Sequence, residues 1–243
     1  MKIILTGVGK GFGRSYLEYL IKKDNYEIIG LTRDLNDFSK NFLKTIKNKK
    51  VTLKAVDLSC TKTVNLFIKN NKKILDNADI LINNAGQRYR APVNKLEYNS
   101  LEKLFRVNVI TPMILSKSVL FGMKKRKFGR IINISSILGS SGLTDLSGYS
   151  ATKGAIDSMT RSMAVEFAKH GITINAIAPG FCETSYAKSF KKNKELNKKI
   201  INRIPMLRWG AEDEINEALE FLISKKSSYI TGHILNIDGG WCA

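Results

Sequence analysis

The sequence predicts a doubly wound α/β fold, in which about seven parallel strands form one sheet with helices on both faces. Short, almost wholly apolar runs alternate with longer segments of helical periodicity throughout the 243-residue chain. Strands without polar alternation are expected where helices cover both faces of a parallel sheet. Because no repeat, low-complexity tract or Pro/Gly/Ser-rich linker divides the chain, we expect a single domain over residues 1–243.

The elements follow one another in the order that this fold requires. The strand candidates are residues 2–6, 27–32, 52–56, 80–82, 130–135, 173–178 and 233–237. Segments between them carry apolar residues at i, i+3 and i+4 and predict helices over residues 12–23, 34–47, 101–125, 149–169 and 212–223. Right-handed crossovers then give a parallel Rossmann-type sheet, and a chain of this length buries about 70–75% of its unfolded surface.

The composition excludes several classes of protein. Hydrophobic residues make up 43% and charged residues 25% of the chain, which is neither disordered nor fibrous composition. The apolar runs are short, and none approaches the ~20 residues of a transmembrane helix. The N-terminal apolar stretch is too brief for a signal peptide, so we expect a cytoplasmic protein that does not enter a membrane.

Cysteine and histidine are too few and too scattered for a metal centre. Cys60, Cys182 and Cys242 lie far apart without Cys-x-x-Cys spacing, and the chain has two histidines. An odd number of cysteines without a signal peptide indicates free thiols rather than disulfides or a zinc site. We therefore expect no metal.

The chain is strongly basic, with 40 Lys and Arg against 21 Asp and Glu and a net charge of +19. Such a charge can attract nucleic acid, anionic lipid or an acidic protein. The lysines nevertheless lie in short separate clusters rather than in one arm with interleaved aromatic residues. This distribution favours a compositional bias toward solvated lysines, and nucleic acid is not the expected partner.

A glycine-rich turn joins the first strand to the first helix. Residues 6–13 read Thr-Gly-Val-Gly-Lys-Gly-Phe-Gly. Glycines at this position let the backbone approach a pyrophosphate, and the helix N-terminus directs free N–H groups and its positive dipole end at that anion. The residues expected to contact a dinucleotide there are Gly7, Gly9, Lys10, Gly11, Phe12 and Gly13.

The end of the second strand indicates which dinucleotide is bound. NAD sites usually place an Asp or Glu there to accept from the ribose 2′-OH. If the strand ends at Thr32, no carboxylate occupies that position and Arg33 follows it, with Lys10 of the glycine turn close by. Two cations suit a 2′-phosphate, so NADP(H) is preferred. A shift of one residue would bring Asp34 toward the ribose, which leaves NAD(H) possible.

Polar residues that suit carbonyl chemistry follow three later strands. Tyr149 and Lys153 are four residues apart at the start of a predicted helix and so share one face. Ser136 follows the fifth strand, and the Asn-Asn-Ala-Gly segment 83–86 follows the fourth. Pro179-Gly180 follows the sixth. The carboxyl ends of the strands are where open α/β sheets bind their ligands.

Together these motifs resemble the short-chain dehydrogenase/reductase family, in its single-domain branch. The resemblance runs nearly end to end, from Thr-Gly-x-x-x-Gly-x-Gly at 6–13 through Tyr-Ser-Ala-Thr-Lys at 149–153 to Asp-Gly-Gly at 238–240. The motifs are short, but their joint order and spacing are specific, with Ser136 thirteen residues before Tyr149. The resemblance implies a pyridine-nucleotide-dependent oxidoreductase that interconverts a ketone and a secondary alcohol.

The resemblance also assigns the catalytic roles. Tyr149 is the general acid in reduction and the base in oxidation, and the ammonium of Lys153 favours its phenolate. Lys153 further binds the nicotinamide ribose, and Ser136 donates a hydrogen bond to the substrate oxygen. Asn108 is expected to hold a water in a proton relay that ends at Lys153. Ser135 is the competing serine, since strand alternation turns only one of the pair to the pocket.

Further cofactor contacts are implied along the same edge of the sheet. Those expected to flank the adenine, the nicotinamide or its ribose are Asp57, Leu58, Asn84, Ala85, Gly86, Tyr149, Lys153, Pro179, Gly180, Cys182 and Thr184. Thr184 is expected at the nicotinamide carboxamide, with Phe181 nearby. We interpret Cys182 as a small wall residue rather than a nucleophile, because no base lies near it in the sequence.

The substrate is less well determined than the reaction. Family resemblance places a substrate lid at about residues 185–206, which is rich in lysine: Lys188, Lys191, Lys192, Lys194, Lys198 and Lys199. Residues 178–184 are similar to 3-oxoacyl-acyl-carrier-protein reductases of fatty acid biosynthesis, which dock an acidic carrier at positions held here by Lys127 and His170. Residues 153–155 and 164–166 are similar to sugar and polyol dehydrogenases. We favour the acyl reductase, with a sugar, polyol or keto-acid dehydrogenase as the alternative.

Two further expectations concern assembly and class. Family members are mostly tetramers built through the two long helices at 101–125 and 149–169, so we expect a homotetramer. A basic Rossmann domain can also bind NADP(H) or nucleic acid without turnover. An intact Ser136, Tyr149 and Lys153 argues against such a silent protein, because a binding module has no need of an activated phenol.

Overall fold

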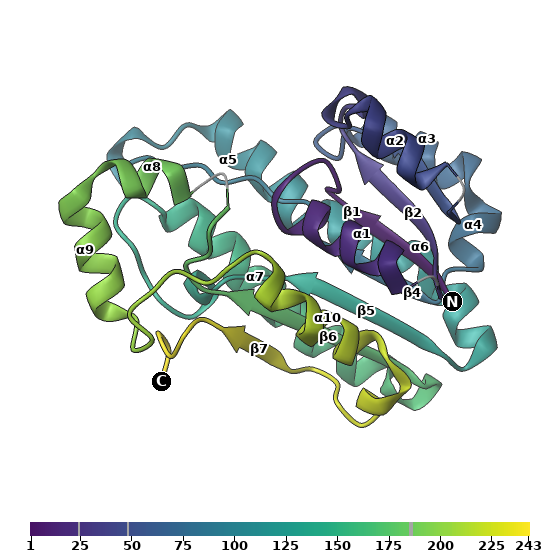
Figure 1. The fold of residues 1–243 in the computed structure, drawn as a ribbon. Helices are drawn as coiled ribbons and strands as arrows, with labels where there is room; N and C mark the ends of the chain where they lie inside the picture. Colours follow the sequence, from purple (N-terminus) through teal and green to yellow (C-terminus); the bar gives the residue numbers. More distant parts are fainter. Residues whose placement is uncertain (24, 48, 185–186) are drawn as a thin grey trace.

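The computed structural model places seven parallel strands in one sheet, in the order β3-β2-β1-β4-β5-β6-β7 (Figure 1). It describes residues 1–23, 25–47, 49–184 and 187–243. The strands are β1 Lys2–Thr6, β2 Glu27–Thr32, β3 Val51–Ala55, β4 Ile80–Asn83, β5 Gly129–Ile134, β6 Ile172–Pro179 and β7 Ile234–Ile237. The order reverses between β1 and β4, so the predicted doubly wound sheet is confirmed.

Helices cross over between the strands. The α-helices are α1 Gly11–Lys23, α2 Lys40–Ile46, α3 Thr61–Asn70, α4 Lys72–Asp76, α5 Tyr98–Phe105, α6 Thr111–Arg126, α7 Ser147–Phe167, α8 Ala187–Lys192, α9 Lys194–Arg203 and α10 Asn216–Ile223. A π-helical turn, Arg106–Ile110, joins α5 to α6, and 3-10 turns include Leu35–Asp37 after β2 and Ile137–Gly139 after β5.

The two faces of the sheet bury separate apolar clusters. Ile3 and Leu5 of β1 pack in the cluster formed with α1 and α10, while Ile4 packs on the opposite face with residues of α3 and α6. Figure 1 shows α1 and α10 in front of the sheet and α6 behind it. Because both faces are covered, β4 and β5 are buried along their whole length, which explains why isoleucine and leucine predominate in them.

The predicted helix over residues 34–47 is wrong as a single element. The Asp34 carboxylate accepts from the N–H of Asn36 and caps the 3-10 turn Leu35–Asp37. The Ser39 hydroxyl then accepts from the N–H of Phe42 at 3.2 Å and starts α2 one residue later. Two side-chain caps therefore divide this segment into a 3-10 turn and a separate α-helix. The spacing of apolar residues does not reveal such caps.

The other boundaries shift by a few residues, and several helices were not foreseen. The predicted helix 101–125 extends over residues 98–126 and contains the π-helical turn, where the hydrogen bonds skip one more residue than in an α-helix. The third strand starts and ends one residue earlier than predicted. The helices α3, α4, α8 and α9 were not predicted from the apolar periodicity of the sequence.

The helix over residues 98–126 is the one helix within the described residues that could span a membrane by length and composition. More than half of its most apolar window, 56%, is buried inside the fold. Leu115, Val119 and Met123 pack in the cluster beneath the sheet. This helix is therefore part of the hydrophobic core.

The closest approach between two helices predicts a measurable effect on stability. Gly122 of α6 lies against the last residue of α4, and a Cβ added there would overlap the carbonyl oxygen of Asp76. Gly122→Ala should therefore lower the free energy of unfolding by about 1–3 kcal/mol, measured by urea denaturation. Gly142→Ala is the matched control, since its Cβ would meet open space. Equal midpoints for the two variants would contradict the packing of α4 on α6.

Candidate active site

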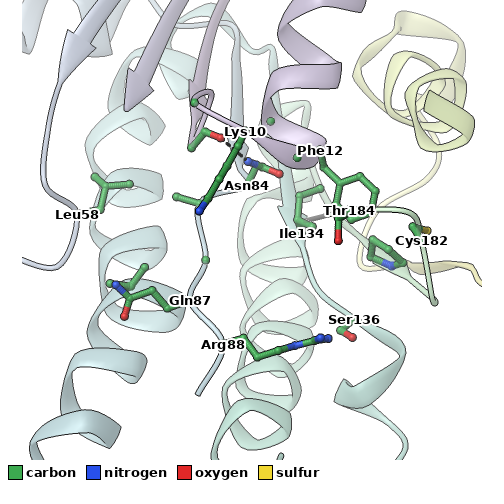
Figure 2. A pocket seen from close by; sticks show the side chains of 18 of the residues that line it. Lys10, Phe12, Leu58, Asn84, Gln87, Arg88, Ile134, Ser136, Cys182 and Thr184 are labelled. Atoms are coloured by element: carbon green, nitrogen blue, oxygen red, sulfur yellow. Dashed lines mark hydrogen bonds between the residues drawn. The ribbon is translucent and has the colours of Figure 1, made fainter. Parts of the chain in front are cut away.

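A large cleft opens at the carboxyl ends of the strands, where the turns that follow β1 to β6 meet (Figure 2). All eighteen residues predicted to contact the cofactor lie along its wall, as do Ser136, Tyr149 and Lys153. The cleft lies where the strand order reverses, and the loops on either side of that reversal diverge to leave a crevice.

The glycine turn has the open backbone that its sequence predicts. Gly7 and Gly11 adopt φ angles of +74° and +57°, which other residues rarely adopt. A Cβ added at Gly13 would overlap the carbonyl oxygen of Gly7, so the first turn of α1 can close only with glycine there. At Gly11 an added Cβ would meet nothing within 4 Å, which leaves the start of α1 open for a ligand.

The turns after β1 and β4 are tied together by one side chain. The amide of Asn84 donates to the carbonyl oxygens of Thr6 at 2.9 Å and Gly7 at 3.2 Å. In return the Thr6 hydroxyl accepts from the N–H groups of Asn84 at 3.0 Å and Ala85 at 2.9 Å. Asn84 therefore fixes the shape of the glycine turn from the neighbouring strand.

The end of β2 agrees with the sequence prediction. The strand ends at Thr32, and Arg33 is exposed on the cleft wall with Lys10. Asp34 does not line the cleft, because its carboxylate caps the following 3-10 turn. Asp37, from the end of that turn, lines the cleft in its place.

The wall after β3 carries Asp57 and Leu58 as predicted. The Asp57 carboxylate accepts from the hydroxyl of Ser59 at 2.7 Å and from its N–H at 2.9 Å. These hydrogen bonds, with the nearby cations Lys103 and Arg33, hold the pKa of Asp57 below its usual range. The carboxylate is thus ionised and held as a fixed acceptor on this wall.

Lys153 and Tyr149 meet at the start of α7. Lys153 is 5% exposed, and its Nζ donates to the Ile134 carbonyl at 2.6 Å, the last residue of β5. Its Nζ lies 5.6 Å from the centroid of the Tyr149 ring. Tyr149 remains partly exposed to the cleft. An ammonium held beside a phenol in a shielded pocket stabilises the phenolate, which is what proton transfer to a carbonyl oxygen requires.

Both serines after β5 line the cleft, so the expectation that only one of them faces the pocket is wrong, but their hydroxyls have different partners. The Ser136 hydroxyl accepts from the N–H of Leu138 at 3.2 Å and remains able to donate into the cleft. The Ser135 hydroxyl instead contacts α7, at the Lys153 carbonyl at 3.5 Å and at Asp157. Burial raises the pKa of Asp157. Ser136 is therefore the serine whose free donor is available to a substrate.

Asn108 does not reach the cleft surface. It is 2% exposed in the π-helical turn, and its side chain accepts from the Gln87 N–H at 2.7 Å. Its amide donates to the Gln87 carbonyl at 2.8 Å and to the Thr152 hydroxyl at 3.0 Å. Both Asn108 and Lys153 lie against Gly86. The structure thus gives Asn108 a role in tethering the segment after β4, and the predicted water relay stays a prediction.

The far wall follows β6. Pro179, Gly180, Cys182 and Thr184 line it as predicted. Burial raises the pKa of the Cys182 thiol to about 12, so it is protonated and suits a wall residue rather than a nucleophile. The predicted lid begins at residues 185 and 186, which lie outside the described residues, and continues into α8 and α9.

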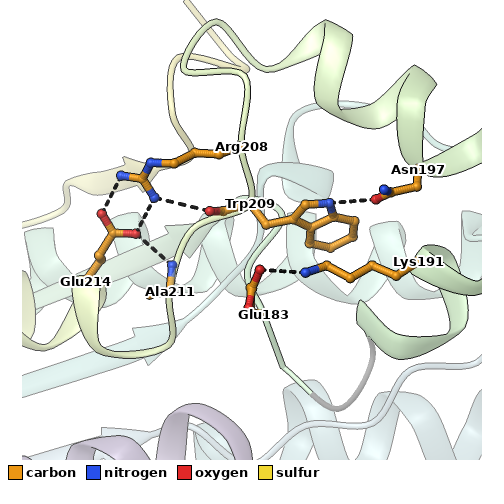
Figure 3. Close-up of polar contacts among 7 residues, drawn as sticks. All are labelled: Glu183, Lys191, Asn197, Arg208, Trp209, Ala211 and Glu214. Carbon is orange, nitrogen blue, oxygen red and sulfur yellow. Dashed lines mark hydrogen bonds and ion pairs between the residues drawn. The ribbon is translucent and has the colours of Figure 1, made fainter. Parts of the chain in front are cut away.

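Aromatic rings hold α8 and α9 over this wall. The Phe181 ring packs edge-on to Phe190 of α8 at 6.1 Å and to Trp209 at 5.3 Å between centroids. The Trp209 indole donates to Asn197 of α9 at 2.9 Å (Figure 3). These contacts join the two helices to the body of the protein.

Ion pairs at the base of the same segment add to this attachment. Arg208 donates to both carboxylate oxygens of Glu214, at 2.7 and 2.8 Å, and Glu214 also accepts from the Ala211 N–H at 2.7 Å (Figure 3). The Arg208 pair lowers the pKa of Glu214 to about 2. Lys191 of α8 donates to Glu183 at 2.5 Å.

The residues along the cleft fit a dinucleotide. The glycine turn leaves a cradle at the N-terminus of the 13-residue helix α1, whose free N–H groups suit a pyrophosphate. Lys10 and Arg33 lie on the wall next to that cradle, and Tyr149 and Lys153 lie farther along the same cleft. When bound, such a group supplies the hydride for reduction of a carbonyl.

Comparison with known proteins agrees with this geometry. Residues 7–242 match the family model described as enoyl-(acyl carrier protein) reductase, a model of short-chain dehydrogenases. The chain belongs to the short-chain dehydrogenase/reductase family.

Curated relatives point to two substrate classes. The chain is 34% identical over 243 residues to 2-dehydro-3-deoxy-D-gluconate 5-dehydrogenase of Bacillus subtilis, covering 98% of this chain and 93% of the relative. It is also 34% identical over 246 residues to 3-oxoacyl-(acyl-carrier-protein) reductase FabG of Buchnera aphidicola, covering 97% and 95%. A solved gluconate 5-dehydrogenase from Burkholderia cenocepacia, in complex with NADP and tartrate, superimposes with a TM-score of 0.91 at 28% identity, covering 99% and 94%.

Family membership fixes the class of reaction. The chain is a short-chain dehydrogenase/reductase that acts on a CH–OH or C=O group. The predicted family, fold and type of enzyme are therefore confirmed. The substrate is not decided by these relatives, because sugar-acid dehydrogenases and acyl reductases match the short-chain enzyme equally well.

Sequence reasoning missed several residues of the cleft. Gln87 and Arg88 continue the segment after β4 into the pocket, and Phe190 and Trp209 close its far side. A signal for Arg88 was present, since a cation lies two residues after the Asn-Asn-Ala-Gly motif at the carboxyl end of a strand. Asp37 lies in a 3-10 turn, Phe190 lies in the lid and Trp209 follows the lid, and the sequence pattern does not reveal the conformation of these segments.

Proposed function

We propose that this short-chain enzyme is an NADP(H)-dependent oxidoreductase that interconverts the ketone and the alcohol of a small carboxylate-bearing substrate of the sugar-acid class. The observation that carries the proposal is the guanidinium of Arg88 beside the catalytic tyrosine. Its Cζ lies 5.0 Å from the centroid of the Tyr149 ring. Figure 2 shows the Arg88 side chain directed across the cleft toward Ser136.

A cation at this position selects for negative charge close to the reacting carbonyl. The Arg88 guanidinium is half-buried and also lies 5.9 Å from the Phe190 ring, so it borders the space in front of Tyr149. A guanidinium fork binds a carboxylate through two parallel hydrogen bonds. A 3-oxoacyl thioester carries no charge near its ketone, whereas a keto sugar acid carries a carboxylate a few carbons away. Arg88 therefore favours the sugar-acid class over the acyl reductase.

A second arginine supports the same wall. Arg90 lies 5.4 Å from the Phe190 ring and pairs with Asp145 at 3.6 Å. The N–H of Ala91 donates to the Asp145 carbonyl at 2.9 Å. The segment after β4 is therefore braced against the loop before α7 and against α8, which keeps Arg88 directed into the cleft.

We assign the three side chains the catalytic roles that the family resemblance implies, and their shared place in the cleft supports this assignment. Tyr149 donates its phenolic proton to the substrate oxygen in reduction and accepts it in oxidation. Ser136 donates a hydrogen bond to the same oxygen and stabilises the charge that develops there. Lys153 holds its ammonium beside the phenol, anchored on the Ile134 carbonyl.

Two cations support the choice of dinucleotide. Lys10 in the glycine turn and Arg33 directly after β2 line the same end of the cleft. Both lie where the adenosine ribose of a Rossmann-bound dinucleotide is expected, and a 2′-phosphate adds two negative charges there. We therefore assign NADP(H) as the preferred dinucleotide, with NAD(H) as a second possibility.

A specific observation also favours an acyl-carrier substrate as the second candidate. Lys124, Lys169 and His170 lie close enough for the two lysines to contribute to lowering the pKa of His170, a shift that is due mainly to desolvation. Lys127 follows α6 in the same region. This basic surface lies at the two helix ends where the acyl reductases of the family dock their acidic carrier.

A second copy of the chain is the proposed partner. The helices α5 to α7 expose large apolar side chains, including Ile110 at 51%, Met113 at 45% and Val165 at 84%. Such a surface on two long helices is typical of an interface. Pairing through these helices supports the homotetramer expected from family resemblance.

The substrate class is tested with NADPH and a panel of ketones. We expect the highest kcat/KM with keto sugar acids such as 5-keto-D-gluconate, and lower values with a neutral ketose of equal length and with an acetoacetyl thioester. Arg88→Met should raise KM for the keto acid about 10- to 100-fold, because a charged hydrogen-bonding partner is removed. Arg88→Lys should retain part of the affinity, and the neutral ketose should respond to neither variant. A preference for the thioester would establish the second candidate instead.

Removal of the phenolic hydroxyl tests the catalytic assignment. Tyr149→Phe should lower kcat about 10²- to 10⁴-fold, the usual contribution of a general acid. Binding of NADPH, followed by its fluorescence, should stay within about twofold because the ring remains. Tyr229→Phe, at a fully exposed tyrosine, is the matched control. Normal turnover by Tyr149→Phe would remove the phenol from the mechanism.

The assembly is tested by light scattering. We expect a mass about four times the 27.2 kDa of the chain, because the apolar side chains of α5 to α7 require a covering partner. Val165→Asp, which introduces a charge into that surface, should dissociate the assembly. A monomeric wild-type protein at micromolar concentration would contradict the proposal.

A further inference from the structure

Of the two carboxylates that line the cation-rich end of the cleft, Asp37 is the one that lies against the glycine turn. The hydroxyl of Thr32, the last residue of β2, lies 3.2 Å from Oδ2 of Asp37 and 3.2 Å from the Asp34 carbonyl oxygen, and it can donate to either. The same Oδ2 packs against the glycine turn so closely that a Cβ at Gly9 would overlap it. Asp37 thus places negative charge against the backbone that approaches the dinucleotide, between the β1 and β2 turns.

The local structure holds Asp37 in this position. The 3-10 turn that carries it is capped by Asp34, and the Arg14 guanidinium donates to the Asp37 carbonyl at 3.1 Å. Arg14 is itself fixed over the Phe38 ring at 4.1 Å. The carboxylate of Asp37 receives one hydrogen bond among the described residues, from Thr32, and has further capacity to accept.

Opposite charges therefore meet where the adenosine ribose is expected. Lys10 and Arg33 attract a 2′-phosphate, while a carboxylate repels it and accepts hydrogen bonds from free ribose hydroxyls. We propose that Asp37 is a specificity-determining residue, which accepts from the adenosine-ribose hydroxyls and lets the enzyme use NAD(H) as well as NADP(H). The inference rests on the dinucleotide site of the proposed function and extends it to the balance between the two cofactors.

The acceptor comes from an unexpected place in the chain. An NAD-binding carboxylate is sought at the end of the second strand, which is occupied here by Thr32. Asp37 lies five residues later, and the 3-10 turn folds it back so that its carboxylate meets the Thr32 hydroxyl. The glycine at position 9 supplies the space for this return.

The test measures the dissociation constants of NADH and NADPH for the full-length protein by nicotinamide fluorescence. Asp37→Asn should tighten NADPH and weaken NADH, so that the ratio of their dissociation constants changes about 10-fold, because a charge next to the phosphate is removed while the amide remains a poorer acceptor. Competition by 2′,5′-ADP and by 5′-ADP should follow the same pattern without any contribution from turnover.

Matched variants separate recognition from folding. Asp34→Asn alters a neighbouring carboxylate that caps the turn and does not line the cleft, and it should leave the ratio within about twofold. Thr32→Val removes the hydroxyl that holds Asp37 and should give a smaller shift in the same direction as Asp37→Asn. A purely structural role for Asp37 would change the two dissociation constants by the same factor.

The outcomes distinguish this inference from the proposed function. A wild-type protein that binds both dinucleotides, with a ratio unmoved by Asp37→Asn or moved equally by Asp34→Asn, overturns the role of Asp37 and leaves the dinucleotide site intact. A wild-type protein that binds neither dinucleotide overturns both. A ratio that changes in Asp37→Asn alone supports the inference.

Discussion

The active site depends on one hydrogen bond, which a buried ammonium donates to a backbone carbonyl. Lys153 is 5% exposed, and an unpaired charge at that depth would be strongly unfavourable. Its hydrogen bond of 2.6 Å to Ile134 satisfies one N–H and fixes α7 to the end of β5. Because Tyr149 lies one helical turn earlier, the same contact sets where the phenol stands. A shift of the helix would break this hydrogen bond to a buried ammonium, so α7 is held in place against the end of β5.

A polar layer beneath the site gives this arrangement a firm base. The Asn83 amide donates to Asn133 at 2.9 Å and to Ser116 at 3.1 Å, and Asn133 donates to Thr160 at 2.8 Å. These buried groups connect β4 and β5 to α6 and α7 through specific directions rather than through apolar contact alone. Although Asn83 Oδ1 has no partner, a misplaced helix would break the hydrogen bonds that the layer does make, so the layer favours one register of helices on the sheet.

The sequence predicted the parts of the site that are local to a strand end or a helix turn. Ser136, Tyr149 and Lys153 could be placed because each follows an apolar strand or starts a periodic helix. Asp37 could not be foreseen, because its position depends on an Asp34 cap that breaks the expected helix. Arg88 had a sequence signal, but its approach to the Tyr149 ring depends on the path of the segment after β4, which tertiary contacts with Asn108 determine. Apolar periodicity therefore predicts which residues lie at the edge of the sheet. The conformation of the loops at that edge can be known only from the three-dimensional structure.

The high positive charge has a functional consequence at the cleft that it does not have over the rest of the surface. Some lysines elsewhere pair along one helix, as Lys72 does with Asp76 and Lys199 with Glu195, and exposed pairs of this kind contribute little. The described cleft wall instead carries four cationic side chains, Lys10, Arg33, Arg88 and Lys153, against two acidic ones, Asp37 and Asp57. A concave, partly desolvated wall of one dominant sign concentrates anions and speeds their association. Both proposed ligands are anionic, so the excess of cations along the wall favours both.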